Sequence, residues 1–410
     1  MQLTRCNSNL KVVSTLKPEE TDIEVSRINF FDFLPEELFL LLAGYLELRT
    51  LGDFRLVCRK FNVIGSDASL IQALFKARFP ILSGFYTQKE MTKELYRKAF
   101  SLEKNIHNSD FRPEKTVFQT IAFGGIRSLA LSEGVLYSKH FSFPDKDILA
   151  WDLNGTQLNR FKTKCTSGWM GITKNYIFTP LPNNRPCYNA LRRIRKSDKE
   201  SIEWEFPEAG FWGFKAIDES IFIGSRLGFF EIDAESGLKR EYLGDSAEPF
   251  FADRNQVLGT NRSSIISWDR ETQEIKEVSP IDTHGSDDNL NWDFSVHAYH
   301  DDTGRIFLAG DRSGLISYDL RQRRMISMTS IHKARVSGIV FYNNEIITAG
   351  LDSIFKIWDV RGLTSLNNDP NPIRSFKIGF PINTLCSEGS SLFIGTRTIY
   401  KYDFSKEEPN

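Results

Sequence analysis

One short pattern recurs along the second half of the chain and constrains the fold more than any other feature. A run of β-forming residues ends in an aromatic or aliphatic residue, an aspartate follows, and turn-forming residues come next. The aspartates are Asp152, Asp233, Asp269, Asp319, Asp359 and Asp403. Successive aspartates are 36 to 50 residues apart, except for a first interval of 81. A β-propeller blade takes about 40–45 residues, so the long interval predicts a degenerate unit near residues 190–198 and seven blades in all.

The end of the chain indicates how such a ring would close. After Asp403 only seven residues remain, which is too few for the outer strand of a four-stranded blade. Residues 116–123 form a spare β-rich run ahead of the first unit. Pairing this strand with the last blade would leave no open sheet edge. The sequence therefore predicts an all-β domain over residues 113–410.

The first 110 residues have helical periodicity instead. Leu38, Leu41, Leu42, Tyr45 and Leu46 recur at the spacing of one helix face, and Phe54, Val57, Cys58, Phe61 and Ile64 repeat the pattern. A capping box at Thr87 and Glu90 predicts a third helix that runs to about Lys104. The expected organisation is multidomain: a flexible leader over 1–29, a helical pair over 30–67, a helical linker over 68–112, and then the β domain.

Composition excludes several classes of protein. The chain has 410 residues with 52 basic and 53 acidic side chains, and a net charge of −1 argues against a nucleic-acid partner. The longest apolar run, Leu38 to Leu46, is too short to span a membrane. Five cysteines without CxxC spacing predict reduced thiols in a cytosol-like compartment and no zinc site.

Residues 34–67 resemble an F-box. The match rests on Leu34-Pro35, Glu37-Leu38, the Tyr45-Leu46 pair, Leu51 and the Val57-Cys58-Arg59-Lys60 run. Phe61 stands where the family usually has tryptophan, so an aromatic side chain is kept. The resemblance implies adaptor-binding roles for Leu34, Pro35, Leu38, Leu42, Leu46, Leu51, Val57, Cys58 and Phe61. Periodicity alone favours a different interpretation, in which these side chains are the core of a helical domain.

The second half resembles a seven-bladed WD-repeat propeller, and the two halves together resemble the F-box/WD-repeat substrate receptors of SCF-type ubiquitin ligases. The resemblance implies a Skp-type adaptor as partner, a cullin bound through it, and a protein substrate held by the propeller. It also implies a non-catalytic receptor without cofactors, in the eukaryotic cytosol, in a host cytosol if the protein comes from a pathogen, or in the nucleus.

Blade 6 carries the polar network of the WD-repeat family. His332, Thr348, Asp352 and Trp358 match the family's His, Thr/Ser, Asp and Trp positions. A histidine near an aspartate and a hydroxyl also occurs in hydrolases. A buried polar network that ties strands together explains these residues better, and no GxSxG, HExxH, P-loop or Rossmann signature is present.

Three arginines share one register. Arg226, Arg262 and Arg312 each stand seven residues before a strand-ending aspartate, where blade 6 has Asp352 and blade 1 has Asp145. In the family this register opens on the substrate-binding face, and guanidinium groups there suit phosphate or carboxylate.

Near the starts of the first strands come Trp169, Trp212, Phe250, Trp292 and Phe380, with Lys333 and Arg335 in blade 6. The predicted substrate site comprises Arg226, Arg262, Arg312, Arg335, Trp169, Trp212 and Trp292, and its ligand is an acidic or phosphorylated peptide segment. The alternative is that the aromatic residues pack between blades and the arginines pair with acids.

Other interpretations remain open. The basic runs at 192–196 and 321–324 are compatible with an import or nucleic-acid signal, although solvated charge at strand ends is the simpler interpretation. A scaffold that assembles proteins without ubiquitin transfer is the main alternative function. Residues 346–361 also resemble the motif by which some WD-repeat proteins join ligases of the cullin-four family.

Overall fold

The structure is a computed structural model, which describes most of the chain from Thr92 to Glu407. The described residues are 72, 76, 92–119, 125–140, 147–163, 169–181, 190–206, 213–225, 228–244, 247–261, 264–281, 294–300, 304–310, 313–342, 345–363 and 371–407. The chain divides into two compact units, Met1–Leu70 and Ile71–Asn410, and all described residues belong to the second. The predicted leader and the predicted adaptor-binding residues therefore lie outside the described residues.

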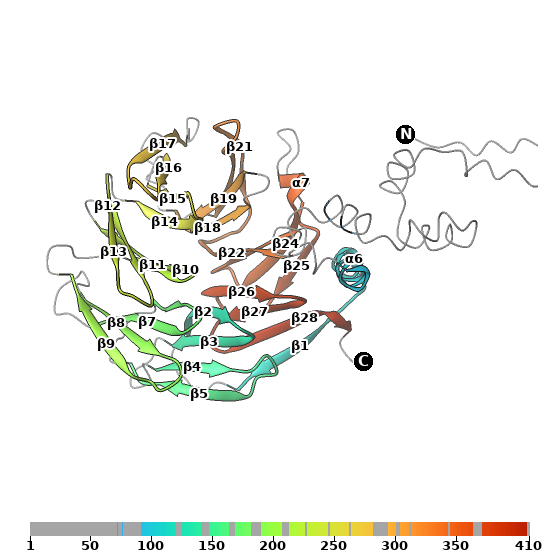
Figure 1. The fold of residues 1–410 in the computed structure, drawn as a ribbon. Coiled ribbons are helices and arrows are strands. Elements are labelled where there is room, and N and C mark those ends of the chain that lie inside the picture. The colour runs from blue at the N-terminus through green and yellow to red at the C-terminus, as the bar shows by residue number, and fades with distance from the viewer. Residues whose placement is uncertain are drawn as a thin grey trace, which may run out of the picture. The chain divides into compact units, whose positions relative to one another are not determined.

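The described strands form seven four-stranded antiparallel sheets arranged as blades around a ring (Figure 1). This confirms the prediction of a seven-bladed propeller. Blade 1 comprises β2 (Ile126–Ser132), β3 (Val135–His140), β4 (Ile148–Trp151) and β5 (Gln157–Phe161). Blade 2 comprises β6 (Gly171–Ile172), β7 (Tyr176–Pro180), β8 (Ala190–Arg195) and β9 (Ser201–Glu205). Blade 3 comprises β10 (Gly213–Ile217), β11 (Ser220–Ser225), β12 (Gly228–Asp233) and β13 (Lys239–Leu243).

The next three blades follow the same order along the chain. Blade 4 comprises β14 (Glu248–Ala252), β15 (Gln256–Thr260), β16 (Ser264–Asp269) and β17 (Ile275–Pro280). Blade 5 comprises β18 (Phe294–His300), β19 (Arg305–Gly310), β20 (Gly314–Asp319) and β21 (Arg324–Ser330). Blade 6 comprises β22 (Val336–Tyr342), β23 (Glu345–Gly350), β24 (Ile354–Asp359) and β25 (Arg374–Lys377), with the short helix α7 (Val360–Leu363) after β24.

Blade 7 joins the two ends of the propeller sequence. Its inner strands are β26 (Thr384–Glu388), β27 (Ser391–Gly395) and β28 (Ile399–Glu407), and its outer strand is β1 (Pro113–Phe118). The pairing runs from Phe118 opposite Ile399 to Glu114 opposite Asp403. Figure 1 shows β1 in cyan beside β28 in red. The sequence placed the closing strand at 116–123, and the structure places it at 113–118.

The repeated aspartate has a local structural reason. It is the last residue of the third strand in blades 3 to 6, follows that strand in blade 1 and lies within β28 in blade 7. In blades 1, 3, 4, 5 and 7, its carboxylate accepts hydrogen bonds from backbone amides two to four residues further on. Asp152 Oδ1, for example, accepts from the amides of Asn154 and Thr156 at 2.9 and 2.7 Å. Asp233 and Asp269 accept from the amides two and three residues further on. This side-chain-to-backbone turn fixes the hairpin from the third to the fourth strand. These backbone hydrogen bonds hold the pKa of all three carboxyls below the ordinary aspartate value.

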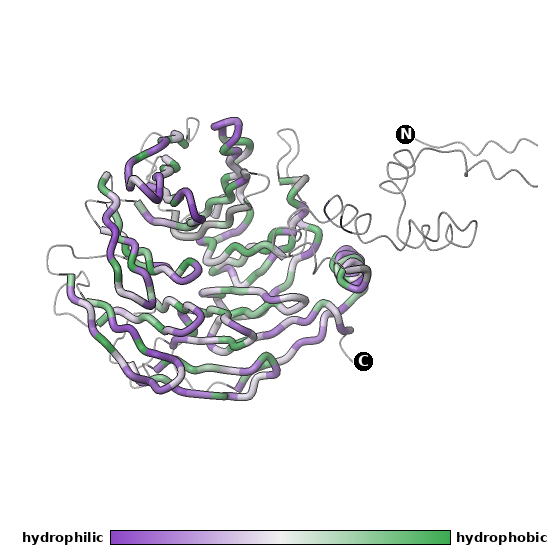
Figure 2. Tube along the Cα trace, in the orientation of Figure 1, coloured by the Kyte–Doolittle hydropathy of each residue, from purple (hydrophilic) through white to green (hydrophobic). Residues whose placement is uncertain are grey.

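The hydrophobic core lies between the blades. Among the described residues, seven clusters of buried side chains each join two neighbouring blades, and the cluster between blades 6 and 7 also includes Leu102 and Ile106. Phe118 and Phe393 of blade 7 pack with Trp151 of blade 1, which closes the ring. Figure 2 shows hydrophobic residues recurring in the strands of every blade. Each blade therefore stabilises its neighbours, as expected of a repeat architecture that cannot bury its faces one unit at a time.

A single long helix, α6 (Lys93–His107), precedes β1 among the described residues. The hydroxyl of its N-cap Thr92 accepts a hydrogen bond from the amide of Leu95 at 3.2 Å, so the helix begins later than the predicted capping box at Thr87. Leu102 and Ile106 are buried in the cluster between blades 6 and 7. Asn105 Nδ2 donates to the Phe404 carbonyl at 2.9 Å. The helix is thereby anchored to the propeller.

Candidate protein-binding face of the propeller

One end of the propeller gathers the connections that the sequence identified. In an antiparallel blade, the turn between the second and third strands lies at the same end as the start of the first strand and the end of the fourth. We call this end the recognition face. Its described part includes Trp169 before β6, residues 331–335 before β22, the turn at 351–353, residues 378–383 before β26 and the turn at 396–398.

Exposed aromatic and basic side chains occur together on the recognition face. Trp169 is 40% exposed and Phe380 is 37% exposed. The guanidinium carbon of Arg397 lies 5.2 Å from the ring centroid of Phe380, which is within the range of a cation–π contact. Lys333 and Arg335 are exposed as well. Tryptophan and arginine, two of these types, are enriched at the centres of protein interfaces.

Two of the seven predicted substrate-binding residues, Trp169 and Arg335, lie on the described part of this face. The other five, Arg226, Arg262, Arg312, Trp212 and Trp292, lie outside the described residues. The strands that flank the three arginines in sequence are described, and they are the second and third strands of blades 3, 4 and 5. The corresponding segment of blade 6 is the turn that holds Asp352.

Phe250 does not belong to the recognition face. It is only 7% exposed and packs in the cluster between blades 4 and 5. The pairing of β14 with β15 shifts between Pro249 and Phe251, so Phe250 is the extra residue of a β-bulge. The alternative interpretation, packing between blades, is correct for this residue.

The predicted polar network of blade 6 is confirmed. His332 Nδ1 lies 3.1 Å from Asp352 Oδ1, and His332 Nε2 lies 2.9 Å from the Thr348 hydroxyl. Burial lowers the pKa of His332 despite the nearby carboxylate. Burial also acts to raise the pKa of Asp352, but hydrogen bonds from the Lys333 amide and from His332 outweigh it, and the pKa lies below its ordinary value. Each of these polar groups is hydrogen-bonded to another group of the same blade, so the network has a structural role.

Sequence reasoning missed a second buried network, between blades 3 and 4. The Glu231 carboxylate accepts hydrogen bonds from the Ser220 hydroxyl at 2.9 Å and the Tyr242 hydroxyl at 2.6 Å, and Arg270 of the next blade binds it through two nitrogens. Burial acts to raise the pKa of Glu231, but these partners outweigh it and lower the pKa. The sequence contains one sign of this network, which is the acidic Glu231 within the otherwise apolar run 228–232.

The basic run at 192–196 is held by partners within the fold. Arg193 Nη1 donates to the carbonyls of Ala234 and Glu235 at 2.7 and 2.8 Å. Arg195 pairs with Asp198 and Glu200. Arg192 and Arg193 are buried within β8, so the prediction of solvated charge at a strand end is wrong for these two residues, and partners within the fold hold them instead.

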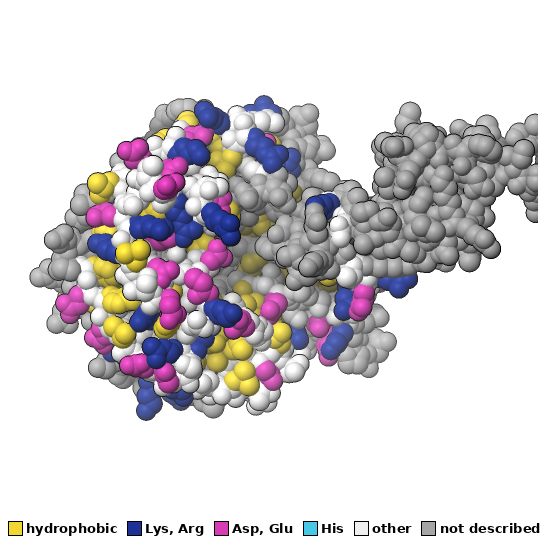
Figure 3. Space-filling model, in the orientation of Figure 1, with side chains coloured by type: hydrophobic (Ala, Val, Ile, Leu, Met, Phe, Trp, Pro, Cys, Tyr) yellow, Lys and Arg dark blue, Asp and Glu magenta, His cyan; other side chains and the backbone are white. Residues whose placement is uncertain are grey.

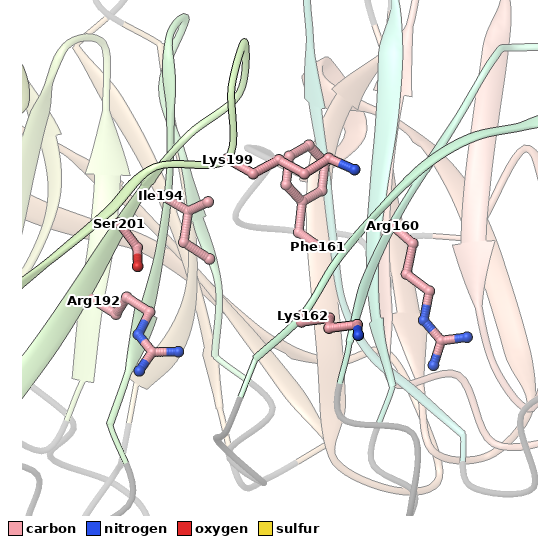
Figure 4. Close-up of a pocket in the computed structure, with 7 residues that line it drawn as sticks. All are labelled: Arg160, Phe161, Lys162, Arg192, Ile194, Lys199 and Ser201. Atoms are coloured by element: carbon pink, nitrogen blue, oxygen red, sulfur yellow. The ribbon is translucent and has the colours of Figure 1, made fainter.

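Arg192 takes part in a small basic pocket between blades 1 and 2 (Figure 4). The pocket has a volume of about 250 Å³ and is lined by Arg160, Phe161, Lys162, Arg192, Ile194, Lys199 and Ser201. Arg160 pairs with Asp147 at 2.5 Å, and Arg192 pairs with Glu203. Two of the four cationic side chains therefore already have carboxylate partners, and the recognition face remains the stronger candidate for binding.

The surface of the described propeller carries charges of both signs. On the side drawn in Figure 3, Lys and Arg side chains are mixed with acidic and hydrophobic ones. This mixture agrees with the near-zero net charge of the chain. Among the described residues, no helix has the length and hydrophobicity that crossing a membrane requires.

Comparisons with known proteins cover both halves of the chain. Residues 31–77 match the F-box-like family model, and this range contains all nine predicted adaptor-binding residues. No curated protein matches the chain in sequence. The propeller is similar to the WD40 β-propeller domain of Doa1, with a TM-score of 0.54 at 10% identity over 72% of this chain and 97% of that chain. It is also similar to the computationally designed Ika8 protein, with a TM-score of 0.51 at 12% identity over 71% of this chain and 99% of that chain.

At such low identities the structural likeness shows the fold alone. The F-box-like match and the fold come from independent comparisons of different parts of the chain. An F-box-like segment thus precedes a seven-bladed propeller that resembles a WD40 domain, and this arrangement is consistent with an F-box/WD-repeat protein.

Proposed function

We propose that this chain is the substrate-recognition subunit of an SCF-type ubiquitin ligase. The observation that carries the proposal is the combination, in one chain, of the F-box-like segment at 31–77 and a closed seven-bladed propeller. F-box domains generally bind Skp-type adaptors, and propellers generally bind protein partners. In this role the adaptor would link the chain to a cullin, the protein would act in the cytosol or nucleus, and the chain would do no chemistry itself.

The substrate would bind across the recognition face. Trp169 and Phe380 offer apolar contact area, and Lys333, Arg335 and Arg397 offer positive charge beside it. A segment with carboxylate or phosphate groups matches this chemistry, since guanidinium groups bind both through paired hydrogen bonds. Arg226, Arg262 and Arg312 would extend the same charge to blades 3, 4 and 5.

Co-purification from cells tests the adaptor half of the proposal. The wild-type chain is expected to capture both a Skp-type adaptor and a cullin, and Leu38→Ala/Leu42→Ala is expected to capture neither. The double variant Leu238→Ala/Leu243→Ala is a matched control, because both leucines are exposed on blade 3. Capture of the adaptor without the cullin would favour the scaffold alternative, in which the propeller assembles proteins without ubiquitin transfer.

Charge reversal tests the substrate half. Changing Arg226, Arg262 and Arg312 to Glu is expected to abolish substrate capture while leaving adaptor capture intact. The control triple, Arg97→Glu, Arg254→Glu and Lys276→Glu, reverses three exposed cations away from the recognition face. If the first triple folds and still holds the substrate, the site is wrong.

A further inference from the structure

Three potential metal ligands converge where α6 meets blade 6. Glu103 and His107 are four residues apart on α6 and so lie on the same helix face. Glu345 begins β23. One ligand atom from each residue lies within 4.8 Å of those of the other two. His107 Nε2 and Glu345 Oε1 are 3.2 Å apart.

The environment of these groups is unusual for carboxylates. Glu103 and Glu345 are both buried, with 8% and 2% of their surface exposed. Asp359, paired with Glu345 across the β23–β24 ladder, adds a third acidic group close by. Carboxylate oxygens and an imidazole nitrogen that converge in this way are ligands that divalent transition-metal ions bind in proteins.

The geometry suits a small transition-metal ion. Zinc binds imidazole nitrogen and carboxylate oxygen at about 2.0–2.2 Å, so two ligands of a tetrahedral site stand about 3.4 Å apart, close to the observed His107–Glu345 separation. An imidazole ligand favours zinc over calcium or magnesium, which prefer oxygen ligands alone. The side chain of His107 is 40% exposed, which gives an ion an entry route and leaves a coordination position for water.

We propose that Glu103, His107 and Glu345 form a binding site for Zn²⁺ or a similar divalent transition-metal ion, which fixes α6 to blade 6. The ion would add to the contacts of Leu102, Ile106 and Asn105 that already hold the helix. The site uses none of the cysteines, so the absence of CxxC spacing does not bear on it. The inference is independent of the proposed ligase function.

Metal titration of the full-length protein tests the proposal. After removal of metal by a chelator, Zn²⁺ is titrated by calorimetry, and Co²⁺ is used as a spectroscopic probe. The wild type is expected to bind one ion at this site. His107→Ala and Glu345→Gln are each expected to raise the dissociation constant of that ion by at least about tenfold. Binding is expected to weaken as the pH falls, because His107 must be deprotonated to bind the ion.

Glu94→Gln is the matched control on the same helix. Glu94 is exposed and pairs only with Lys98 among the described contacts, so this variant is expected to bind the ion as the wild type does. His107→Ala keeps the test valid if Glu345→Gln fails to fold, because the imidazole is partly exposed and its removal leaves the core intact. The proposal is overturned if the wild type binds no ion, if both variants bind as tightly as the wild type, or if the Co²⁺ spectrum shows only thiolate coordination.

Discussion

The indole Nε1 of Trp358 lies 2.9 Å from the hydroxyl of Thr348, deep inside blade 6. The same hydroxyl lies 2.9 Å from His332 Nε2, so one threonine side chain joins two partners from different parts of the blade. Because all three groups are buried, the loss of this hydroxyl would leave two polar groups without water or protein to bind.

Thr348→Val is therefore expected to destabilise the propeller by about 2–4 kcal/mol, the cost of two unsatisfied buried groups. Urea unfolding monitored by tryptophan fluorescence measures the change. Thr116→Val, on the half-exposed outer strand β1, is the control and is expected to change stability by less than about 0.5 kcal/mol. Equal effects of the two substitutions would show that the network contributes no stability.

His332 is expected to remain neutral at pH values at which an ordinary histidine is protonated. Burial lowers its pKa in the folded protein, whereas the unfolded chain titrates near the usual value of about 6.5. Its contribution to stability is therefore fully present above about pH 6.5 and is lost as the pH falls below that value. An NMR titration of the imidazole checks this, and a His332 pKa at or above 6.5 in the folded protein would contradict it.

Glu231→Gln is expected to cost about 2–3 kcal/mol at pH 7, because it leaves the Arg270 guanidinium without its carboxylate partner. This expected loss of stability is smaller than the loss for a fully buried ion pair, because the Arg270 side chain is 21% exposed. The folded-state pKa of Glu231 is lowered, so its stabilisation is present above the unfolded pKa of about 4.3 and is lost at lower pH. The stability difference between wild type and variant should narrow between pH 7 and pH 3.5, and Glu274→Gln, at an exposed position, should show no such trend.

Phe118 tests the closure of the ring. Its side chain is buried between blades 7 and 1, so Phe118→Ala is expected to cost about 3–5 kcal/mol. Val117 is the neighbouring residue on β1 and points to the other side of the strand, where it is 49% exposed. Val117→Ala is expected to cost less than about 1 kcal/mol. Thermal unfolding measures the stability lost in each variant. Similar losses of stability in the two variants would mean that β1 does not close the core.

Features repeated along the chain could be predicted from the sequence. In six of the seven blades an aspartate stands at or near the end of the third strand, and where it accepts from backbone amides these lie only two to four residues away, so its spacing indicates the blades. The blade 6 network is similarly local, since His332 and Trp358 belong to one repeat. The aspartate turn recurs because several blades form the same hairpin between their third and fourth strands.

Contacts between distant parts of the chain could not be predicted. His107 and Glu345 are 238 residues apart, and only the docking of α6 on the propeller brings them together. Glu231 and Arg270 belong to different blades, and neither residue type recurs at the corresponding positions of the other blades. The sequence predicts Phe250 beside the exposed aromatic residues of the recognition face, but a β-bulge turns its side chain into the core. The pattern of hydrophobic residues does not reveal this bulge.

Direct binding between the purified full-length chain and a purified Skp-type adaptor tests the proposed function most directly. Calorimetry is expected to show one adaptor bound per chain, with binding lost in Leu38→Ala/Leu42→Ala and retained in Leu238→Ala/Leu243→Ala. If the wild-type chain does not bind the adaptor, or if the first variant binds as tightly as the wild type, the ligase proposal is contradicted and the propeller must act without an F-box partner.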